Sequence, residues 1–281
     1  MAKRRFYKRK YRSLVAAGSL SLFIFFLTGL IDNVVGGWML GEIALSAISL
    51  AMPFFTLIVF FGKLVGTGTA AVYSLECGRF HEQQAHRVFG QGVVLAVASG
   101  VVMSAVLFFG RSSFLHFFRA STNILDQASA YYFNFCWIAL VYPLYQVGYN
   151  MVYNDGDERL CVLSDVVQIA VNTVASVLLT PRFGISGLSI GTLMGIIGGL
   201  LVLCIHAFRP SNSIRFRFGF CGEDLKNMFS NGLAASFSSL LTAVLTMYFS
   251  RLIVSHFTEH LLPVYSIVQM FVDFAGVFGG V

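Results

Sequence analysis

The chain has 281 residues, of which 57% are hydrophobic and only 11% are charged, and its mean hydropathy is +0.76. Soluble domains contain about 25% charged residues, so this composition excludes a soluble protein. The formal net charge of +6 is interpreted as a sign of membrane topology and of contact with anionic membrane lipid. No nucleic-acid partner is expected.

Apolar stretches of roughly 20 residues recur along the chain, each long enough to cross a hydrocarbon core of about 30 Å. All are expected to be helices, because a lipid-exposed backbone must satisfy its own hydrogen bonds. They lie near 14–35, 46–75, 88–110, 127–153, 160–180, 184–208, 230–255 and 262–281. The sequence therefore predicts an all-α polytopic membrane protein.

Basic residues are distributed unevenly between the loops. Seven Lys and Arg residues precede the first span, whereas the loops predicted to face outward carry Arg111, Arg119 and Arg182. By the positive-inside rule, this asymmetry predicts a multi-pass protein of the plasma membrane with a cytoplasmic N-terminus. The basic segment lacks a small-residue cleavage site after a short apolar core, so we interpret it as a retained tail.

The five cysteines lie in spans or on the predicted inner face, where disulfides are rare. None has His or Cys neighbours at the spacing of a metal site. Neither a disulfide, a metal nor another cofactor is expected.

Asp32 lies near the outer end of the first span. A carboxylate inside an apolar helix costs about 2.5–3.5 kcal/mol on insertion scales and is a functional hypothesis by default. An acid in such surroundings can take up a proton near neutral pH and so bias which conformation is populated. We interpret Asp32 as an ion-coupling residue, with a purely structural polar contact as the alternative. Thr28, one turn earlier on the same face, and Asn33 are expected to support it or to line a cavity.

Lys63 lies near the middle of the second span and has two interpretations. It contacts substrate or a counter-ion in a cavity, or it is a structural partner for a carboxylate or for carbonyl groups, since most intramembrane charges are paired. Direct pairing with Asp32 is not favoured, because the two lie at different depths. Small residues beside Lys63 form a stripe that allows another helix to approach closely: Gly62, Gly66, Ala70, Ser74 and Gly78.

The fourth span carries phenols and amides at helical spacing. The residues expected to line a substrate cavity are Tyr145, Gln146, Tyr149 and Asn150, flanked by Tyr142 and Tyr153. Such a wall can bind organic cations by ring faces and hydrogen bonds. An interfacial aromatic belt combined with helix packing is the alternative, although this stripe extends over three turns.

A second polar stripe follows the fifth span. Its members share one helical face, because they stand at i, i+3, i+7 and i+11: Asp165, Gln168, Asn172 and Ser176. A stripe of this length cannot face lipid cheaply, so Gln168 and Ser176 are expected to line a cavity. Asp165 is interpreted either as a coupling or substrate residue or as a hydrogen-bonded structural residue near the cytoplasmic end.

Two segments resemble the start of the multidrug and toxic compound extrusion (MATE) family, "IDNVVGGWMLGEIALSAISLAMP" and "GKLVGTGTAAVYSLECGRF". The matching residues are Asp32, Gly36, Leu40, Gly41, Ala44, Leu45, Ala47, Pro53, Gly66, Gly68, Ser74, Gly78 and Arg79. Later points of similarity are Asn150, the Gly156-Asp157 turn and the helix start "FGISGLSIGTLMG".

The resemblance implies two six-helix lobes around a central cavity, which alternates between inward- and outward-facing states and exchanges H⁺ or Na⁺ for an organic cation. It implies a coupling role for Asp32. It also matches Asn172 to a family Asn in the fifth span, and Asn172 is likewise expected to take part in ion coupling. The family often has an acidic residue four positions after that Asn. Ser176 stands there in this chain, so a second carboxylate is lacking at that position.

The expected organisation is a basic tail (1–13), a six-helix lobe (14–208), a cytoplasmic linker (209–226) and two helices of a second lobe (227–281). Shifted by 217 residues, Leu45 meets Leu262 and Ser49 meets Ser266, a weak repeat of the kind common in transporters. The sequence therefore predicts a partial chain, whose missing C-terminal lobe is needed for function.

These observations favour a secondary active antiporter that exports organic cations or drugs in exchange for H⁺ or Na⁺ by alternating access. One alternative is a flippase for lipid-linked oligosaccharide or polysaccharide, but its pyrophosphate would require several cations, and the spans contain only Lys63 and Arg251. Another is a truncated, non-transporting membrane protein. An enzyme is not expected, because no nucleophile with a base, phosphate loop or metal cluster appears.

Overall fold

The computed structural model describes residues 2–279, and every regular element in that range is a helix. The predicted all-α polytopic fold, with a six-helix lobe and the start of a second one, is confirmed. The side chains of the basic tail, Lys3 to Arg12, lie outside the described residues, as does the end of the last predicted span.

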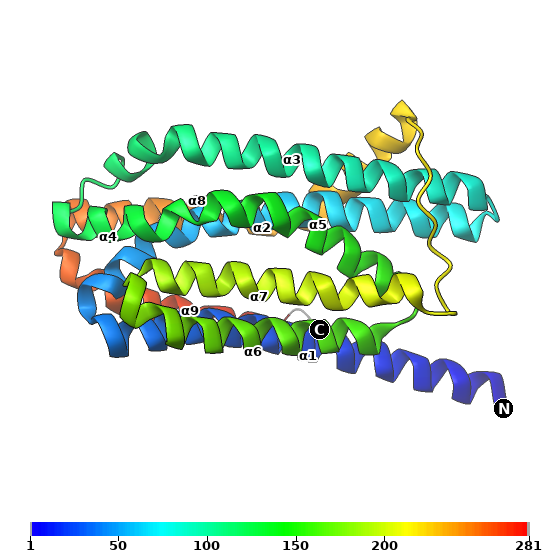
Figure 1. Cartoon of the computed structure of the whole chain (residues 1–281), viewed down its shortest axis with the longest axis horizontal. Coiled ribbons are helices and arrows are strands. Elements are labelled where there is room, and N and C mark those ends of the chain that lie inside the picture. The colour runs from blue at the N-terminus through cyan, green and yellow to red at the C-terminus, as the bar shows by residue number, and fades with distance from the viewer. Residues whose placement is uncertain (1, 280–281) are drawn as a thin grey trace.

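The helices lie side by side along the long axis of the molecule (Figure 1). They are α1 (Ala2–Leu40), α2 (Glu42–Gly78), α3 (Glu82–His116), α4 (Thr122–Phe133), α5 (Phe135–Asn154), α6 (Glu158–Phe183), α7 (Ser186–Cys204), η1 (Ile205–Phe208), α8 (Gly222–His256), η2 (Glu259–Leu261) and α9 (Leu262–Gly279). The end of the bundle that carries the N-terminus and residues 209–221 is called the linker end, and the opposite end, with Gly41 and residues 257–261, is called the far end.

Within the described part of the chain, five helical segments are long and apolar enough to cross a membrane, namely α2, α3, α6, α7 with η1, and α8. In α1 the described apolar part is the shorter segment Phe26–Leu40. The fourth predicted span, 127–153, is divided in the structure between α4 and α5, which meet at Asn134. The Asn134 amide donates a hydrogen bond of 2.9 Å to the hydroxyl of Ser189 in α7, which holds this junction against its neighbour.

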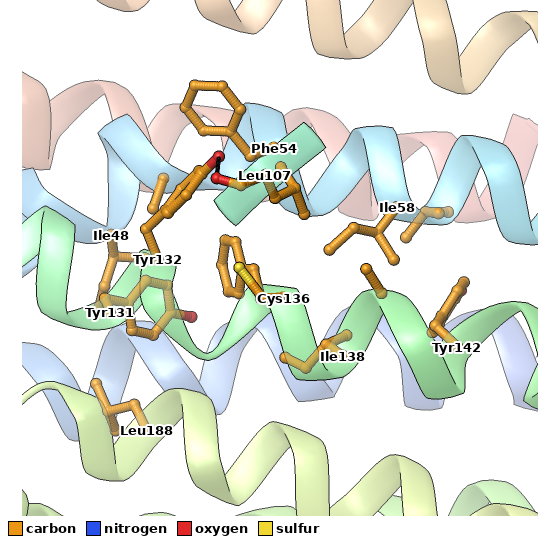
Figure 2. Close-up of a cluster of buried hydrophobic side chains, with 14 of the residues drawn as sticks. Ile48, Phe54, Ile58, Leu107, Tyr131, Tyr132, Cys136, Ile138, Tyr142 and Leu188 are labelled. Atoms are coloured by element: carbon orange, nitrogen blue, oxygen red, sulfur yellow. Dashed lines mark hydrogen bonds between the residues drawn. The ribbon is translucent and has the colours of Figure 1, made fainter. Parts of the chain in front are cut away.

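Helix α2 is the centre of the packed core, where it contacts α3, α4, α5 and α8. Figure 2 shows its side chains Ile48, Phe54 and Ile58 facing residues of α4 and α5. Phe54 packs edge-on against Tyr132, with ring centroids 5.0 Å apart. The hydroxyl of Tyr132 donates to the carbonyl of Leu107 at 3.0 Å, so this buried phenol is satisfied without water.

Glycines of α2 bring two other helices into close contact. A Cβ atom at Gly62 would lie 2.6 Å from the ring of Tyr142 in α5, and one at Gly68 would lie 2.1 Å from the carbonyl oxygen of Met228 in α8. At Gly232 of α8, a Cβ atom would lie 1.9 Å from the carbonyl oxygen of Leu64. The small-residue positions therefore fix α2 between α5 and α8.

Residues 209–221 have no helix or strand and connect η1 to α8. The expected linker, 209–226, is shorter here because α8 begins at Gly222, with Glu223 and Asp224 in its first turn, where acidic side chains complement the helix dipole.

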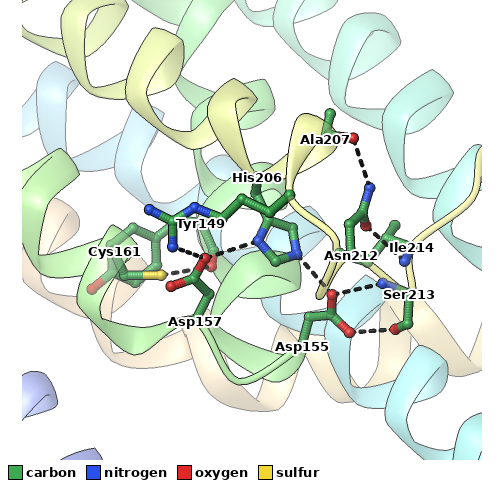
Figure 3. Close-up of polar contacts among 10 residues, drawn as sticks. Tyr149, Asp155, Asp157, Cys161, His206, Ala207, Asn212, Ser213 and Ile214 are labelled. Atoms are coloured by element: carbon green, nitrogen blue, oxygen red, sulfur yellow. Dashed lines mark hydrogen bonds and ion pairs between the residues drawn. The ribbon is translucent and has the colours of Figure 1, made fainter.

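The turn between α5 and α6 holds the start of this linker (Figure 3). Asp155 accepts the backbone N–H of Ser213 at 3.0 Å and the Ser213 hydroxyl, and Nε2 of His206 lies 2.7 Å from its carboxylate. Asp157 lies 3.1 Å from Nδ1 of His206 and accepts from Arg209 at 2.6 Å. Burial acts to raise the pKa of Asp155, but the hydrogen bonds from Ser213 and His206 outweigh it and hold the pKa below its usual range.

Asp155→Asn is expected to loosen the linker at neutral pH, because hydrogen bonds to a charged group contribute about 1.5–3 kcal/mol. Exchange of the backbone amides near Ser213 should accelerate about tenfold or more, as measured by hydrogen–deuterium exchange. Because the pKa of Asp155 is lower in the folded protein than its unfolded value of 3.8, its charge stabilises the folded state at every pH above 3.8. This stabilisation is lost as the pH falls through the folded-state pKa. Protection of these amides in the wild-type protein should therefore decline only in acid.

The matched control is Glu223→Gln, at an exposed position of α8, which should leave the exchange unaltered. Equal acceleration in both variants would show that the contact between Asp155 and Ser213 does not hold the linker.

Candidate functional site: a buried carboxylate between α1, α4, α6 and α7

Asp32 is buried near the far end of α1, with 4% of its surface exposed. Its Oδ2 atom accepts hydrogen bonds from the hydroxyl of Tyr131 in α4 at 3.2 Å and from the hydroxyl of Thr192 in α7 at 3.0 Å. Its Oδ1 atom has no hydrogen-bond partner among the described residues. One carboxylate oxygen is therefore held by protein donors, and the other is buried without a hydrogen-bond partner among the described residues.

Thr192 joins Asp32 to the polar stripe of α6. The side-chain amide of Asn172 donates to the Thr192 hydroxyl at 3.0 Å, and Asn172 is fully buried. The structure therefore brings together two of the three residues predicted to couple ions, Asp32 and Asn172, which lie on separate helices. Thr192 both donates to the carboxylate and accepts from the amide.

The close approach of α6 and α7 depends on glycines of α7. A Cβ atom at Gly191 would lie 2.3 Å from the hydroxyl oxygen of Ser176, and one at Gly195 would lie 2.6 Å from the carbonyl oxygen of Gln168. Larger residues at these positions would push α7 away from α6 and separate Thr192 from Asn172. The glycine pattern of this helix thus assembles the site.

Two further oxygens of this region lack a partner among the described residues, Oδ1 of Asn172 and Oγ of Ser176. Both side chains are fully buried, and an unsatisfied buried polar group costs about 1–3 kcal/mol. Carboxylate, amide and hydroxyl oxygens are the ligands that hard cations prefer, and a carboxylate also accepts a proton. The arrangement can therefore hold a small cation or a proton, although among the described residues it contains no cluster of three acidic, His or Cys side chains.

Asp165 belongs to a second polar cluster on the linker side of α6. Its carboxylate accepts hydrogen bonds from Tyr145 at 2.9 Å and Tyr149 at 3.1 Å, both in α5. Seven residues separate Asp165 from Asn172, a rise of about 10 Å along the helix, and the half-buried Gln168 lies between them. The stripe predicted from spacing is thus one face of α6 that contacts two different helices. Asp165 contacts α5, and Asn172 contacts α7.

The amides of the fourth span lie in the contact between α5 and α2. Gln146 donates to the hydroxyl of Tyr142 at 2.7 Å, and Asn150 donates to the backbone carbonyl of Gln146 at 2.8 Å. Gly66 of α2 is packed against this backbone, since a Cβ atom there would lie 2.8 Å from the carbonyl oxygen of Gln146. The structure therefore does not bring these amides to Asp32.

The remaining predicted residues bind other partners. Thr28 donates to the carbonyl of Ile24 in its own helix at 3.0 Å. Asn33 accepts a hydrogen bond of 2.8 Å from Ser266 of α9, and the ammonium of Lys63 donates to Ser239 of α8 at 3.2 Å. Asn33 and Lys63 thus connect the first six spans to the helices that follow the linker.

Sequence reasoning missed Tyr131 and Thr192, the two donors to Asp32. Tyr131 lies 99 residues from Asp32, and Thr192 lies 160 residues from it, so local spacing gives no link between them. A signal for Thr192 was present in its position next to Gly191, within a glycine-lined helix face opposite the polar face of α6. Tyr131 was included in a continuous apolar span and had no distinguishing pattern.

The fold and this site define a multi-pass helical membrane protein with a buried carboxylate where four helices meet. The MatE family model matches residues 18–178, more than half of the chain, and the chain belongs to this family. The predicted MATE membership, made from the Asp32 and Gly-rich segments, is thereby confirmed.

Relatives with multidrug names support the assignment. The probable multidrug resistance protein YoeA of Bacillus subtilis (strain 168) is 24% identical over 189 residues, which cover 65% of this chain and 40% of YoeA. A MATE family transporter of the MOP superfamily in an inward-facing conformation matches with a TM-score of 0.81, 20% identity and coverage of 86% of this chain and 56% of that one. The MATE multidrug transporter DinF-BH, in a complex with a ligand, gives a TM-score of 0.87 at 17% identity, over 96% of this chain and 61% of that one. The chain thus spans between two fifths and about three fifths of the length of these relatives.

Proposed function

We propose that this chain forms the first lobe and the start of the second lobe of a secondary active antiporter, which exports organic cations or drugs in exchange for H⁺ or Na⁺. Family membership and the multidrug names of the relatives support export of small molecules. The observation that carries the coupling role is the Asp32 carboxylate, which is buried with one oxygen hydrogen-bonded and the other without a partner among the described residues. An intramembrane acid in such a position is typical of ion-coupled transport.

The coupling step follows from the neighbours of Asp32. A proton or Na⁺ bound at the unpaired Oδ1 atom changes the charge at the junction of α1, α4 and α7. An ion shifts a conformational equilibrium only if it binds one state better than the other. Asn33, the next residue, is hydrogen-bonded to Ser266 of α9. A movement of α1 at Asp32 is therefore passed directly to the second lobe, which is the displacement that alternating access requires.

The proposed orientation places the linker end in the cytoplasm and the protein in the plasma membrane. Basic residues gather at that end, including Arg79, Arg87, Arg159, Arg215 and Arg217, which agrees with the positive-inside rule. We expect transport to require the rest of the second lobe, of which α8 and α9 are the beginning.

Two intramembrane cations bear on the flippase alternative. Lys63 binds Ser239 between α2 and α8, whereas the guanidinium of Arg251 lies 4.1 Å from the ring centroid of Phe117 near the far end. A pyrophosphate would be best held by several cations around one site. Their separation favours export of a cation over movement of an anionic lipid-linked sugar.

The test is ion-driven efflux from proteoliposomes that contain the full-length protein. Ethidium, a fluorescent organic cation, is loaded as the probe, and its release is followed by the fluorescence that it gains on binding DNA added outside the vesicles. Release is compared under a pH gradient, a Na⁺ gradient or neither. One of the two gradients is expected to accelerate release severalfold over protein-free vesicles, and dissipating it with an ionophore should abolish the gain. Equal release with and without both gradients would overturn the proposal.

A further inference from the structure

The linker continues as an extended strap, residues 214–220, that crosses α3 before α8 begins (Figure 1). The rings of Phe216 and Phe89 are 6.3 Å apart. A Cβ atom at Gly90 would lie 2.2 Å from the carbonyl oxygen of Arg217, so the strap backbone rests directly on α3. It is therefore a packed element with a fixed place on the bundle.

Both ends of the strap are anchored. Ser213 precedes it and is held by Asp155. After it, the carbonyl of Cys221 accepts a hydrogen bond of 3.2 Å from Gln91, and Asp224 forms an ion pair of 3.0 Å with Arg87. These anchors determine which side chains the strap presents outward.

The outward side chains are aromatic and cationic. Phe218 is 81% exposed and Phe220 is 74% exposed. Arg215 and Arg217 are also exposed, and neither forms an ion pair with any described residue. No acidic residue occurs within 214–220. The surface thus combines unpaired positive charge with large exposed rings over a few residues.

The strap lies at the edge of the exposed apolar surface of α3. Exposed apolar side chains on α3 begin at Val94 and continue to Phe109. Gly90, under the strap, lies one helical turn before Val94, a rise of about 6 Å. Helix α3 has 35 residues, or about 52 Å, and so extends well beyond a hydrocarbon core of about 30 Å. The strap therefore crosses α3 near the boundary between hydrocarbon and headgroups.

We propose that this strap is a binding surface for anionic phospholipid headgroups in the leaflet at the linker end. Arg215 and Arg217 bind lipid phosphate, for which the planar guanidinium is well suited. Phe218 and Phe220 occupy the interfacial layer, where aromatic side chains are enriched, and basic segments next to a membrane are attracted to anionic lipid. The inference does not depend on the antiport proposal, because it concerns only the placement of the linker.

The test uses Phe218→Trp as a fluorescent reporter in the full-length protein, with every native tryptophan, including Trp38 and Trp137, replaced by Phe. The protein is reconstituted with brominated phosphatidylglycerol or brominated phosphatidylcholine, and both bromolipids quench a tryptophan in contact with them. Quenching by the anionic lipid is expected to exceed quenching by the zwitterionic lipid at least about twofold. The double change Arg215→Gln and Arg217→Gln should reduce this ratio towards one.

The matched control is Arg119→Gln with Arg182→Gln, which removes two exposed charges at the far end and should leave the ratio unchanged. Phe220→Trp provides a second reporter if the first variant folds poorly. A water-like emission with no quenching would overturn the proposal, as would an apolar emission that neither bromolipid quenches, because another part of the protein would then cover the strap. Equal quenching by the two lipids would also overturn it.

Discussion

Asp32→Asn is expected to reduce ion-driven ethidium efflux to the level of protein-free vesicles. The amide has nearly the size of the carboxylate, and its oxygen can still accept from Thr192 and Tyr131, which lie 3.0 and 3.2 Å from Oδ2. It can neither bind a proton in the physiological range nor carry the charge that attracts Na⁺. The measurement is efflux in the proteoliposome assay, together with equilibrium ethidium binding to separate coupling from substrate recognition.

Asp126→Asn is the matched control, since Asp126 is an exposed carboxylate on the neighbouring helix α4. It should retain wild-type efflux. Near-normal gradient-driven efflux by the Asp32 variant would remove Asp32 from the coupling mechanism, even if the protein exports ethidium. Loss of efflux in both variants would show that the assay responds to surface charge and not to the buried site.

Gly232→Ala is expected to destabilise the protein, because it adds a methyl group where α8 packs against the backbone of α2. The new Cβ atom would lie 1.9 Å from the carbonyl oxygen of Leu64, and backbone atoms cannot rotate away as side-chain atoms can. Overpacking costs about 1–3 kcal/mol, occasionally more, whereas Ala in a helix gains at most about 1 kcal/mol over Gly. Equilibrium unfolding in micelles, followed by circular dichroism, should show a net destabilisation of about 2 kcal/mol, because so short a contact falls at the upper end of the overpacking cost.

Gly78→Ala adds the same methyl at the end of α2, where nothing lies within 4 Å of the new atom. It should be neutral or slightly stabilising. Gly68→Ala, which meets the carbonyl oxygen of Met228 at 2.1 Å, should destabilise like Gly232→Ala. If both tight-site variants unfold as the control does, then α2 and α8 are not packed backbone to backbone.

The fold could be predicted because its main signals are local. Apolar stretches and basic segments each act over a few residues, so the spans and their order follow from the sequence. The break at Asn134 was not visible, because Tyr131, Tyr132 and Phe135 continue an apolar pattern across it. What separates α4 from α5 there includes a contact with Ser189, 55 residues away.

The site could be predicted only in part, for a related reason. An acid in an apolar helix identifies Asp32 by itself, and helical spacing places Asp165 and Asn172 on one face of α6. Spacing cannot tell which helix covers each part of that face. In the structure α7 covers Asn172 through Thr192, while α5 covers Asp165 through two tyrosines. Residues of one stripe therefore belong to two different polar clusters.

The packing of α8 on α2 changes where the moving units of the protein begin and end. The linker marks the boundary between lobes along the chain, yet Gly68 and Gly232 hold α8 against α2, and Gly62 holds α2 against α5. In a rocking motion that preserves these contacts, α8 would move together with the first lobe as one rigid unit. Under the proposed alternating access, the flexing point would fall at residues 257–261, between α8 and α9, a full helix away from the lobe boundary that the sequence suggests.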